Sequence, residues 1–549
     1  MPTDRAAPGW RQRYGVLAAA LTLTALCQAL IILRSPVIAK DAIGFIRIAR
    51  SLATDPVATL RTEDQHPGYP AMVLAAERCY RWLSGRPEFD CYLAATRLAS
   101  ATCGLLSTLF LWLFARRLYD DRIANVTVLL AAVWPLFRFN ASDGLSDTPH
   151  LTFYLAGAWL AAEGLVRGRI GWIVAAGVAS GLAFWVRPEG LVVGVAAGLV
   201  CGAKFVRLRL VSRGQAIFIA AIVAATLLMV VPYVLVAGKI TSKKLPFHRP
   251  VSAHAQAIAA AEPTAGLLAE PPPGGTLPDE FRRPGTFLGT LALGLFELAR
   301  ELAQGFYYLA LIPLAAGTFA PARPQPNRSV VLLHVLLMNG HAALLLLLYL
   351  TAGYISHRHV LPLVALMLPT AAAGTICLAD EASRRIRFAG SPRRALAIAV
   401  CIFYVGLVPK CLRPLHEVYL PLLQAAQCVK SQAKPGDSVL STSGYVRFYT
   451  DLPGILVGCE APNLPIGLAL APGQPWSFIV LEVDDRSFDR RTLCGATGQY
   501  EQLLELPAHP RKPWAKVLVF RTHSNSSVSL SVSLSSSDGP RSSSSSSRR

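Results

Sequence analysis

Ionisable side chains stand just beyond the ends of long apolar runs at several points in the chain, and their types suit chemistry at a membrane surface. Asp41 follows the first apolar run, and the segment from His66 to Pro70 lies further along the same loop. Ionisable groups at membrane depth are costly and usually functional, so we expect these side chains to form one site. The candidate residues are Asp41, His66, Tyr69, Asp143, Asp147, Arg187, Glu189, Lys243, Lys244, His357 and Arg358.

The set combines carboxylates with permanent cations. A positioned carboxylate such as Asp41 can deprotonate a hydroxyl group, and the guanidinium groups of Arg358 and Arg187 can form bidentate, charge-assisted hydrogen bonds to an anion. Lys243 or Lys244 could approach the same anion from a second loop. The other candidates would bind substrate.

Each residue also has an ordinary structural interpretation when it is taken alone. Asp41 could be a solvated loop residue, and the segment from His66 to Pro70 could be only a turn. Asp143 and Asp147 could cap the helix that follows them. Arg187 and Glu189 could form a charge pair at a helical hairpin. His357 and Arg358 could extend to the membrane interface.

The composition predicts a polytopic membrane protein. Of the 549 residues, 53% are hydrophobic and 16% are charged, whereas a soluble domain carries about a quarter charged residues. The apolar residues come in blocks of about 20, the length that crosses a bilayer. The net charge of +20 could suggest nucleic acid, but the arginines cluster in short loops between apolar blocks. This is the positive-inside pattern of membrane topology, so we expect no nucleic-acid partner.

Eleven transmembrane helices are predicted, with the N-terminus inside and the C-terminal domain outside. The first apolar run, 14–33, could be a cleaved signal peptide, but its length and the missing cleavage site favour an uncleaved helix. The loops that this topology places inside are all basic, and the outer segments 141–149 and 351–357 contain no Lys or Arg. The predicted spans are 14–33, 94–115, 123–140, 150–166, 170–186, 189–204, 215–237, 306–320, 329–350, 359–378 and 394–411.

The chain divides into four predicted parts: a cytoplasmic N-terminus (1–13), a transmembrane domain (14–411), a small extracytoplasmic α/β domain (412–523) and a disordered Ser-rich tail (524–549). Two long outer loops, 34–93 and 238–305, belong to the transmembrane domain. Each contains a predicted interfacial helix, 43–52 or 287–304, and the Pro-rich part 262–285 is expected to be disordered. In the outer domain we predict strands at 438–442, 455–457, 478–481 and 517–520, and helices at 417–432 and 500–506.

The eleven cysteines show neither CxxC nor metal-ligand spacing. Cys79 could pair with Cys91, and Cys459 with Cys494, because we place both pairs outside the cytoplasm. His357 and the nearby His359 could bind a cation, but an interfacial role is favoured. We therefore predict no metal site and no cofactor. The residue pattern alone does not exclude a divalent metal ion.

The order of these motifs resembles the GT-C superfamily of polyprenyl-phosphate-sugar-dependent glycosyltransferases. The resemblance covers about residues 14–411 and is nearest to bacterial protein-mannosyltransferase and aminoarabinose-transferase members, which are similar to glycosyltransferase family 39. It implies a mostly α, polytopic fold of GT-C type, with Asp41 as catalytic base and the segment from His66 to Pro70 shaping the pocket. Arg358 matches an arginine before a late Leu-Pro span. Many relatives have a second acid, a tyrosine and another tyrosine where this chain has Ala42, Phe45 and His359.

The predicted function is transfer of a sugar from a polyprenyl phosphate donor, with inversion, to a lipid, glycan or protein acceptor on the extracytoplasmic side. The sugar-bearing polyprenyl phosphate is then a co-substrate, with Asp41 as the base and with Arg358, Arg187 and Lys243 or Lys244 as candidate ligands of its phosphate. Membrane lipids surround a multi-pass protein of the plasma membrane. A membrane transporter or lipid flippase without glycosyl transfer is the alternative. Such proteins show inverted repeats and midplane charges, whereas here the polar set lies at one face.

Overall fold

The computed structural model describes residues 10–208, 213–241, 287–319, 327–385, 391–456, 476–484, 500–509 and 512–522. These residues form two compact units, of which the first ends at Leu420 and the second begins at Pro421. The first unit is helical and contains every candidate residue that the structure describes. The second is built on a sheet. Lys243 and Lys244, the Pro-rich segment 262–285 and the tail 524–549 lie outside the described residues.

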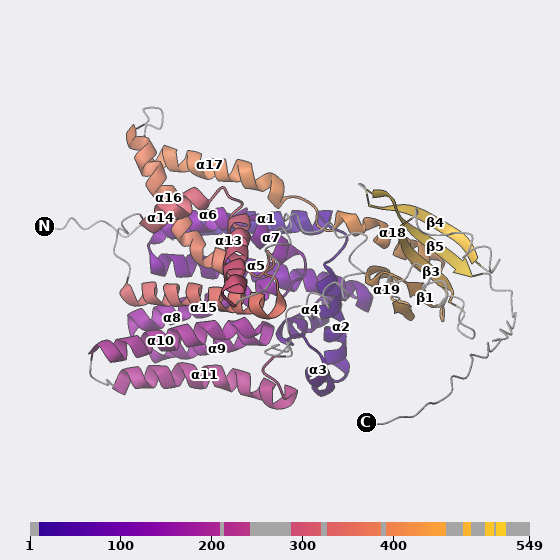
Figure 1. The fold of residues 1–549 in the computed structure, drawn as a ribbon, viewed down its shortest axis with the longest axis horizontal. Coiled ribbons are helices and arrows are strands. Elements are labelled where there is room, and N and C mark those ends of the chain that lie inside the picture. Colours follow the sequence, from indigo (N-terminus) through magenta and orange to yellow (C-terminus); the bar gives the residue numbers. More distant parts are fainter. Residues whose placement is uncertain are drawn as a thin grey trace, which may run out of the picture. The chain divides into compact units, whose positions relative to one another are not determined.

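The first unit consists of long helices and a group of shorter ones (Figure 1). Its helices are α1 (Trp10–Arg34), α2 (Lys40–Thr54), α3 (Pro56–Thr62), α4 (Gly68–Ser84), α5 (Glu88–Leu118), α6 (Asp121–Ala132), α7 (Pro135–Ser142), α8 (Asp147–Arg167), α9 (Ile170–Val186), the 3-10 helix η1 (Pro188–Gly190), α10 (Leu191–Leu208), α11 (Arg213–Ala237), α13 (Phe287–Gly305), α14 (Leu311–Phe319), α15 (Arg328–Ala352), α16 (Leu361–Arg385), α17 (Pro392–Cys411) and the 3-10 helix η4 (Glu417–Tyr419).

Six helices in the described part of the chain are long and apolar enough to cross a membrane: α1, α5, α11, α15, α16 and α17. A seventh span is possible if α6 and α7, which are bent by 58° at a short break, are counted together. Each of the eleven predicted spans overlaps a helix, but α9 and α10 are shorter apolar helices and α14 has only nine residues. The prediction of a mostly α, polytopic protein is confirmed, whereas the count of eleven is not.

Small residues allow the long helices to pack closely. Helices α8, α9, α10 and α11 run side by side (Figure 1). At Gly177 in α9, an added Cβ would lie 2.8 Å from the carbonyl oxygen of Ile222 in α11, so only glycine fits. Close backbone approach through small residues is the usual basis of helix association in lipid.

Three short helices, α2 to α4, gather near one end of α8 and α9 (Figure 1). The predicted amphipathic segment 43–52 lies in α2, which buries Phe45, Ile46 and Ile48. Helix α4 begins where the backbone passes very close to the end of α9, because a Cβ at Gly68 would lie 2.6 Å from the carbonyl of Trp185. The loop from His66 to Pro70 is therefore a packing junction between α4 and α9.

The second unit contains α18 (Leu420–Gln432), α19 (Gly444–Thr450) and a five-stranded mixed sheet of order β2-β1-β3-β5-β4. The strands are β1 (Val439–Ser441), β2 (Gly454–Leu456), β3 (Phe478–Asp484), β4 (Tyr500–His509) and β5 (Lys512–Thr522). Strand β1 pairs in parallel with β2 and β3, while β5 pairs antiparallel with β3 and β4. The predicted small α/β domain is confirmed as a mixed sheet with helices.

One sequence-based prediction outside the candidate site is wrong, and one possible disulfide is not formed. The segment 500–506, predicted to be a helix, lies in edge strand β4, where antiparallel pairing with β5 outweighs its helix-like spacing of leucines. Pro507 fits this assignment, since proline is tolerated in edge strands. Cys79 and Cys91 are both free thiols, so they do not form the disulfide considered above. Cys459 and Cys494 lie outside the described residues.

Candidate functional site

Four charged residues from distant parts of the chain meet at the ends of their helices. Asp41 lies in the first turn of α2, Asp147 begins α8, Arg187 follows α9 and Arg358 precedes α16. An Arg358 Nη atom donates to Asp41 Oδ2 at 2.7 Å, and the other lies 4.0 Å from Asp147 Oδ2. Arg187 Nη2 lies 2.8 Å from Asp147 Oδ1. The two acids and two arginines thus form a continuous series of ion pairs, in the order Asp41, Arg358, Asp147 and Arg187.

Burial differs along this chain of ion pairs. The Asp147 side chain is only 3% exposed, whereas the side chains of Asp41 and Arg358 are 51% and 37% exposed. Ser146, not an aspartate, occupies the N-cap of α8, and its side chain forms no capping bond. Asp143 closes the end of α7 rather than beginning a helix. Neither aspartate is therefore the N-cap of the helix that follows it.

Arg358 is the centre of the electrostatic field. Burial acts to lower the pKa of its guanidinium, but the carboxylates of Asp147 and Asp41 raise it more, and the net pKa lies above the ordinary value. The cation is therefore permanent. Asp41, in turn, lies in the first turn of α2, where the helix dipole favours a negative charge. A phosphate that reaches Arg358 would compete with Asp41 for the same guanidinium.

A cavity of about 280 Å³ opens beside these pairs. Its lining includes the predicted residues Asp147, Arg187, Glu189 and Arg358, and it also includes His150 and His341, which sequence reasoning missed. Both histidines are at least 97% buried. The lining residues are Asp147, His150, Arg187, Glu189, His341, Leu345, Arg358, His359, Leu361 and Pro362.

Two ring nitrogens that the protein leaves without a hydrogen-bond partner lie on the residues of this cavity: Nε2 of His150 and Nδ1 of His341. The other nitrogen of His341, Nε2, lies 3.3 Å from the carbonyl oxygen of His359 and donates to it, so Nδ1 is left as an acceptor. Buried polar atoms in folded proteins are nearly always paired. This pocket therefore offers unsatisfied polar atoms to water or a ligand, with Nδ1 of His341 as an acceptor.

His66 and Tyr69 are buried near the site but do not line its cavity. His66 stacks on Tyr233 with ring centroids 5.2 Å apart and meets the Phe184 ring edge-on at 5.1 Å. The Tyr69 hydroxyl donates to the Thr96 carbonyl at 2.9 Å. Both side chains thus secure the loop that carries Asp41, and the structure places them in packing rather than at the substrate surface.

His357 stands next to Arg358 but faces another partner. Its Nδ1 lies 3.7 Å from Glu301 Oε2 in α13. Burial raises the pKa of Glu301, but the bonds from His357 and Arg300 lower it more, so the pKa lies below the usual value. His357 therefore links α13 to the loop before α16 and is not among the residues that line the cavity.

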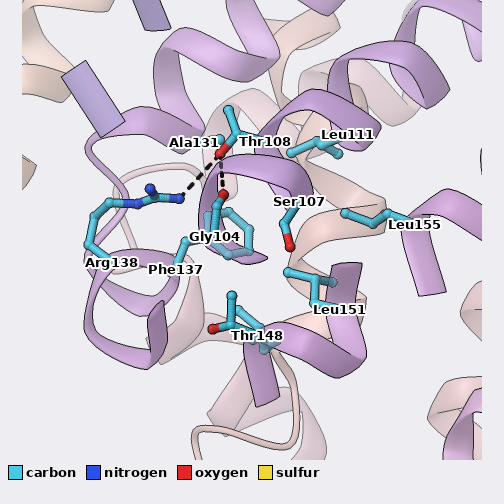
Figure 2. Close-up of a pocket in the computed structure, with 11 residues that line it drawn as sticks. Gly104, Ser107, Thr108, Leu111, Ala131, Phe137, Arg138, Thr148, Leu151 and Leu155 are labelled. Carbon is cyan, nitrogen blue, oxygen red and sulfur yellow. Dashed lines mark hydrogen bonds between the residues drawn. The ribbon is translucent and has the colours of Figure 1, made fainter. Parts of the chain in front are cut away.

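A second cavity lies behind the site, between α5, α7 and α8, and Leu361 lines both cavities. Figure 2 shows the guanidinium of Arg138 pointing toward Thr108, with Ser107 next to Thr108 on α5 and Thr148 below them on α8. Arg138 Nη2 donates to Thr108 Oγ1 at 3.4 Å. Within the described residues, no cluster of three or more His, Cys, Asp or Glu could hold a metal ion in either cavity.

The comparisons with known proteins agree with this architecture. Residues 89–236 match the family model described as Dolichyl-phosphate-mannose-protein mannosyltransferase. The structure of ArnT from Cupriavidus metallidurans bound to undecaprenyl phosphate is similar over 94% of this chain and 99% of that one, with 17% identity and a TM-score of 0.57. The apo oligosaccharyltransferase of Archaeoglobus fulgidus matches 94% of this chain and 75% of that one, with 11% identity and a TM-score of 0.53. No curated protein sequence matches the chain.

The fold is that of the GT-C glycosyltransferases, as the resemblance implied. The family match over residues 89–236 agrees with this fold. The family match and the shared fold agree with the prediction of a glycosyltransferase. The family match covers Asp143, Asp147, Arg187 and Glu189, while Asp41 and Arg358 lie outside it.

Proposed function

We propose that this protein transfers a sugar from a polyprenyl phosphate to an acceptor on the extracytoplasmic side of the plasma membrane, with inversion at the anomeric carbon. The observation that carries the proposal is the Arg358 guanidinium, which bridges Asp41 and Asp147 at the edge of a cavity. It places a permanent cation for a phosphate within 2.7 Å of a carboxylate that could serve as base. The solved structure of ArnT with undecaprenyl phosphate supports a lipid-phosphate ligand for this fold.

In the proposed reaction, the oxygen of an acceptor hydroxyl group attacks the anomeric carbon. The bond between that carbon and the phosphate oxygen breaks, and the electron pair leaves with the polyprenyl phosphate. Asp41 takes the proton from the acceptor. Arg358 and Arg187 stabilise the charge on the departing phosphate. Because the phosphate competes for Arg358, donor binding would also release Asp41 from its ion pair and prepare it to act as base.

The transferred sugar would lie in the cavity beneath the two arginines. The acceptor nitrogen of His341 and the carboxylate of Glu189 suit the hydroxyl groups of a sugar, and the unpaired His150 nitrogen adds a third contact. The acceptor is a lipid, glycan or protein. No step in this mechanism requires a cofactor, and independence from metal ions stays a prediction.

The first test is transfer of radiolabelled sugar from polyprenyl phosphate donors by the purified protein. We expect Asp41→Asn to lower the rate by about 10²–10⁴-fold while binding of polyprenyl phosphate persists. Asp64→Asn is the matched control, since Asp64 lies in the same outer loop with its side chain 86% exposed. Full activity in Asp41→Asn would move the base to Asp143 or Asp147. Lipid binding without transfer from any donor would overturn the proposed reaction.

A further inference from the structure

The segment that joins the last membrane helix to the second unit contacts both of the loops that carry the candidate acids. We refer to residues 412–416 as the clip. The Leu415 amide donates to Ser35 Oγ at 2.8 Å, and Arg34 Nη1 donates to the Leu412 carbonyl at 3.3 Å. Ser35 begins the short stretch that leads to Asp41. The clip is therefore fixed to the Asp41 loop at two points.

The clip reaches the other acid-bearing loop through a single side chain. His416 Nε2 lies 2.8 and 2.9 Å from the two carboxylate oxygens of Asp143. Asp143 begins the loop that ends at Asp147, whose carboxylate pairs with Arg187. The His416 ring also packs beside Tyr419, at 5.9 Å between centroids. The clip therefore contacts both segments that carry the acids of the ion pairs: the one that leads to Asp41 and the one from Asp143 to Asp147.

Two features show that this contact is built at a cost. Asp143 stands at the C-terminal end of α7, where the helix dipole disfavours a negative charge, and its side chain is only 10% exposed. His416 adopts a left-handed backbone conformation, with φ 58° and ψ 28°, which residues other than glycine rarely take. Backbone strain of this kind persists where the surroundings hold it, often at functional sites.

We propose that His416 is a positioning residue for the transfer reaction. By holding the Asp143 carboxylate, it fixes the loop from Asp143 to Asp147 against the loop that carries Asp41, so that base and phosphate ligands keep a productive separation. This inference rests on the proposed function. His416 would not touch the reacting atoms itself, and the sequence gives no sign of it, because it stands alone after the last apolar run.

The test measures kcat, donor affinity and hydrogen exchange in the full-length protein. We expect His416→Ala to lower kcat about 10–100-fold, with the Kd for polyprenyl phosphate changed less than about twofold. His416→Gln should recover most of the loss, because a glutamine amide can donate from nearly the position of Nε2. His416→Gly removes the backbone strain but not the defect. Glu417→Gln, an exposed neighbour in the same linker, is the control and should behave as wild type.

A double-mutant cycle separates positioning from an independent effect. If His416 acts through Asp143, His416→Ala adds no further loss to Asp143→Asn. Additive losses, or a glutamine variant as slow as the alanine variant, would overturn the proposal. Amide hydrogen exchange tests the positioning role without measuring sugar transfer. In His416→Ala, amides of 35–41 and 142–147 should exchange faster even if no sugar donor is ever found, and unchanged exchange would refute the clip.

Discussion

At the scale of single residues, the structural role of the ion pair between Arg187 and Asp147 can be separated from the functional role that we propose for it. Because the Asp147 side chain is 3% exposed, Arg187→Met would leave a buried carboxylate with Arg358 alone, at 4.0 Å. Breaking a buried pair in this way costs about 3 kcal/mol. We expect lower thermal stability and no detectable transfer in this variant.

The double variant distinguishes the two roles. Adding Asp147→Asn to Arg187→Met removes the unpaired charge, so stability should return toward wild type while transfer stays absent. Arg187→Lys keeps the charge but cannot bond Asp147 and Ser146 together as the fork of Arg187 does, and its donor affinity should fall about tenfold. Thermal unfolding in detergent and lipid-binding assays measure both effects. Recovery of transfer in the double variant would show that Arg187 serves the fold only.

At the scale of elements, strand β3 carries a carboxylate, that of Glu482, in the middle of the sheet of the second unit. It is the central strand in the order β2-β1-β3-β5-β4, and burial raises the pKa of its Glu482 to about 7. The folded state therefore keeps this proton at pH values where the unfolded chain has released it. The stabilising effect of the bound proton is complete below about pH 4 and declines as the pH rises toward 7.

A neutral side chain at this position should remove that dependence. We expect Glu482→Gln to be more stable than wild type at pH 8, by about 1–3 kcal/mol, and to show little difference at pH 4. Melting curves of the purified protein at several pH values measure the gap, and Glu501→Gln, an exposed site on β4, is the control. A gap that stays constant with pH would show that Glu482 ionises normally.

Elements were predictable where the pattern of apolar residues decided them. The long spans and strands β1, β2, β3 and β5 follow from such runs, because burial is the main determinant of both. The prediction of a helix at 500–506 was wrong because the spacing of its leucines suits a helix. The segment is extended because it pairs with strand β5. Local pattern cannot supply a long-range pairing.

The candidate site was predictable where charges stand at helix ends. Asp41 and Arg358 are 317 positions apart, and their hydrogen bond could not be derived from spacing. His150 could have been suspected, since it lies three residues after Asp147 and so on the same face of α8. His341 sits within an apolar helix and His416 after one, where a lone histidine looks the same whether it packs or binds.

At the scale of the whole first unit, the directions of the helices support one membrane orientation. Helices α8, α9 and α16 each have a residue of the site at one end: Asp147, Arg187 and Arg358. Their opposite ends lie in basic loops that contain Arg167, Arg169, Arg384 and Arg385. Arg122, in the first turn of α6, forms an ion pair with Asp380 near the same end of α16, at 3.0 Å. Since basic loops remain cytoplasmic, the site should face the extracytoplasmic side.

Chemical labelling of intact cells decides this orientation. Cys79 is a native, exposed thiol on α4, in the loop that carries the site. A membrane-impermeant maleimide should modify it in intact cells, as located by mass spectrometry, because α4 then lies outside the bilayer on the donor side. A thiol introduced by Arg384→Cys should react only after permeabilisation. The reverse pattern would place Asp41 and Arg358 in the cytoplasm, and the proposed transfer would then have to use donors from the inner leaflet.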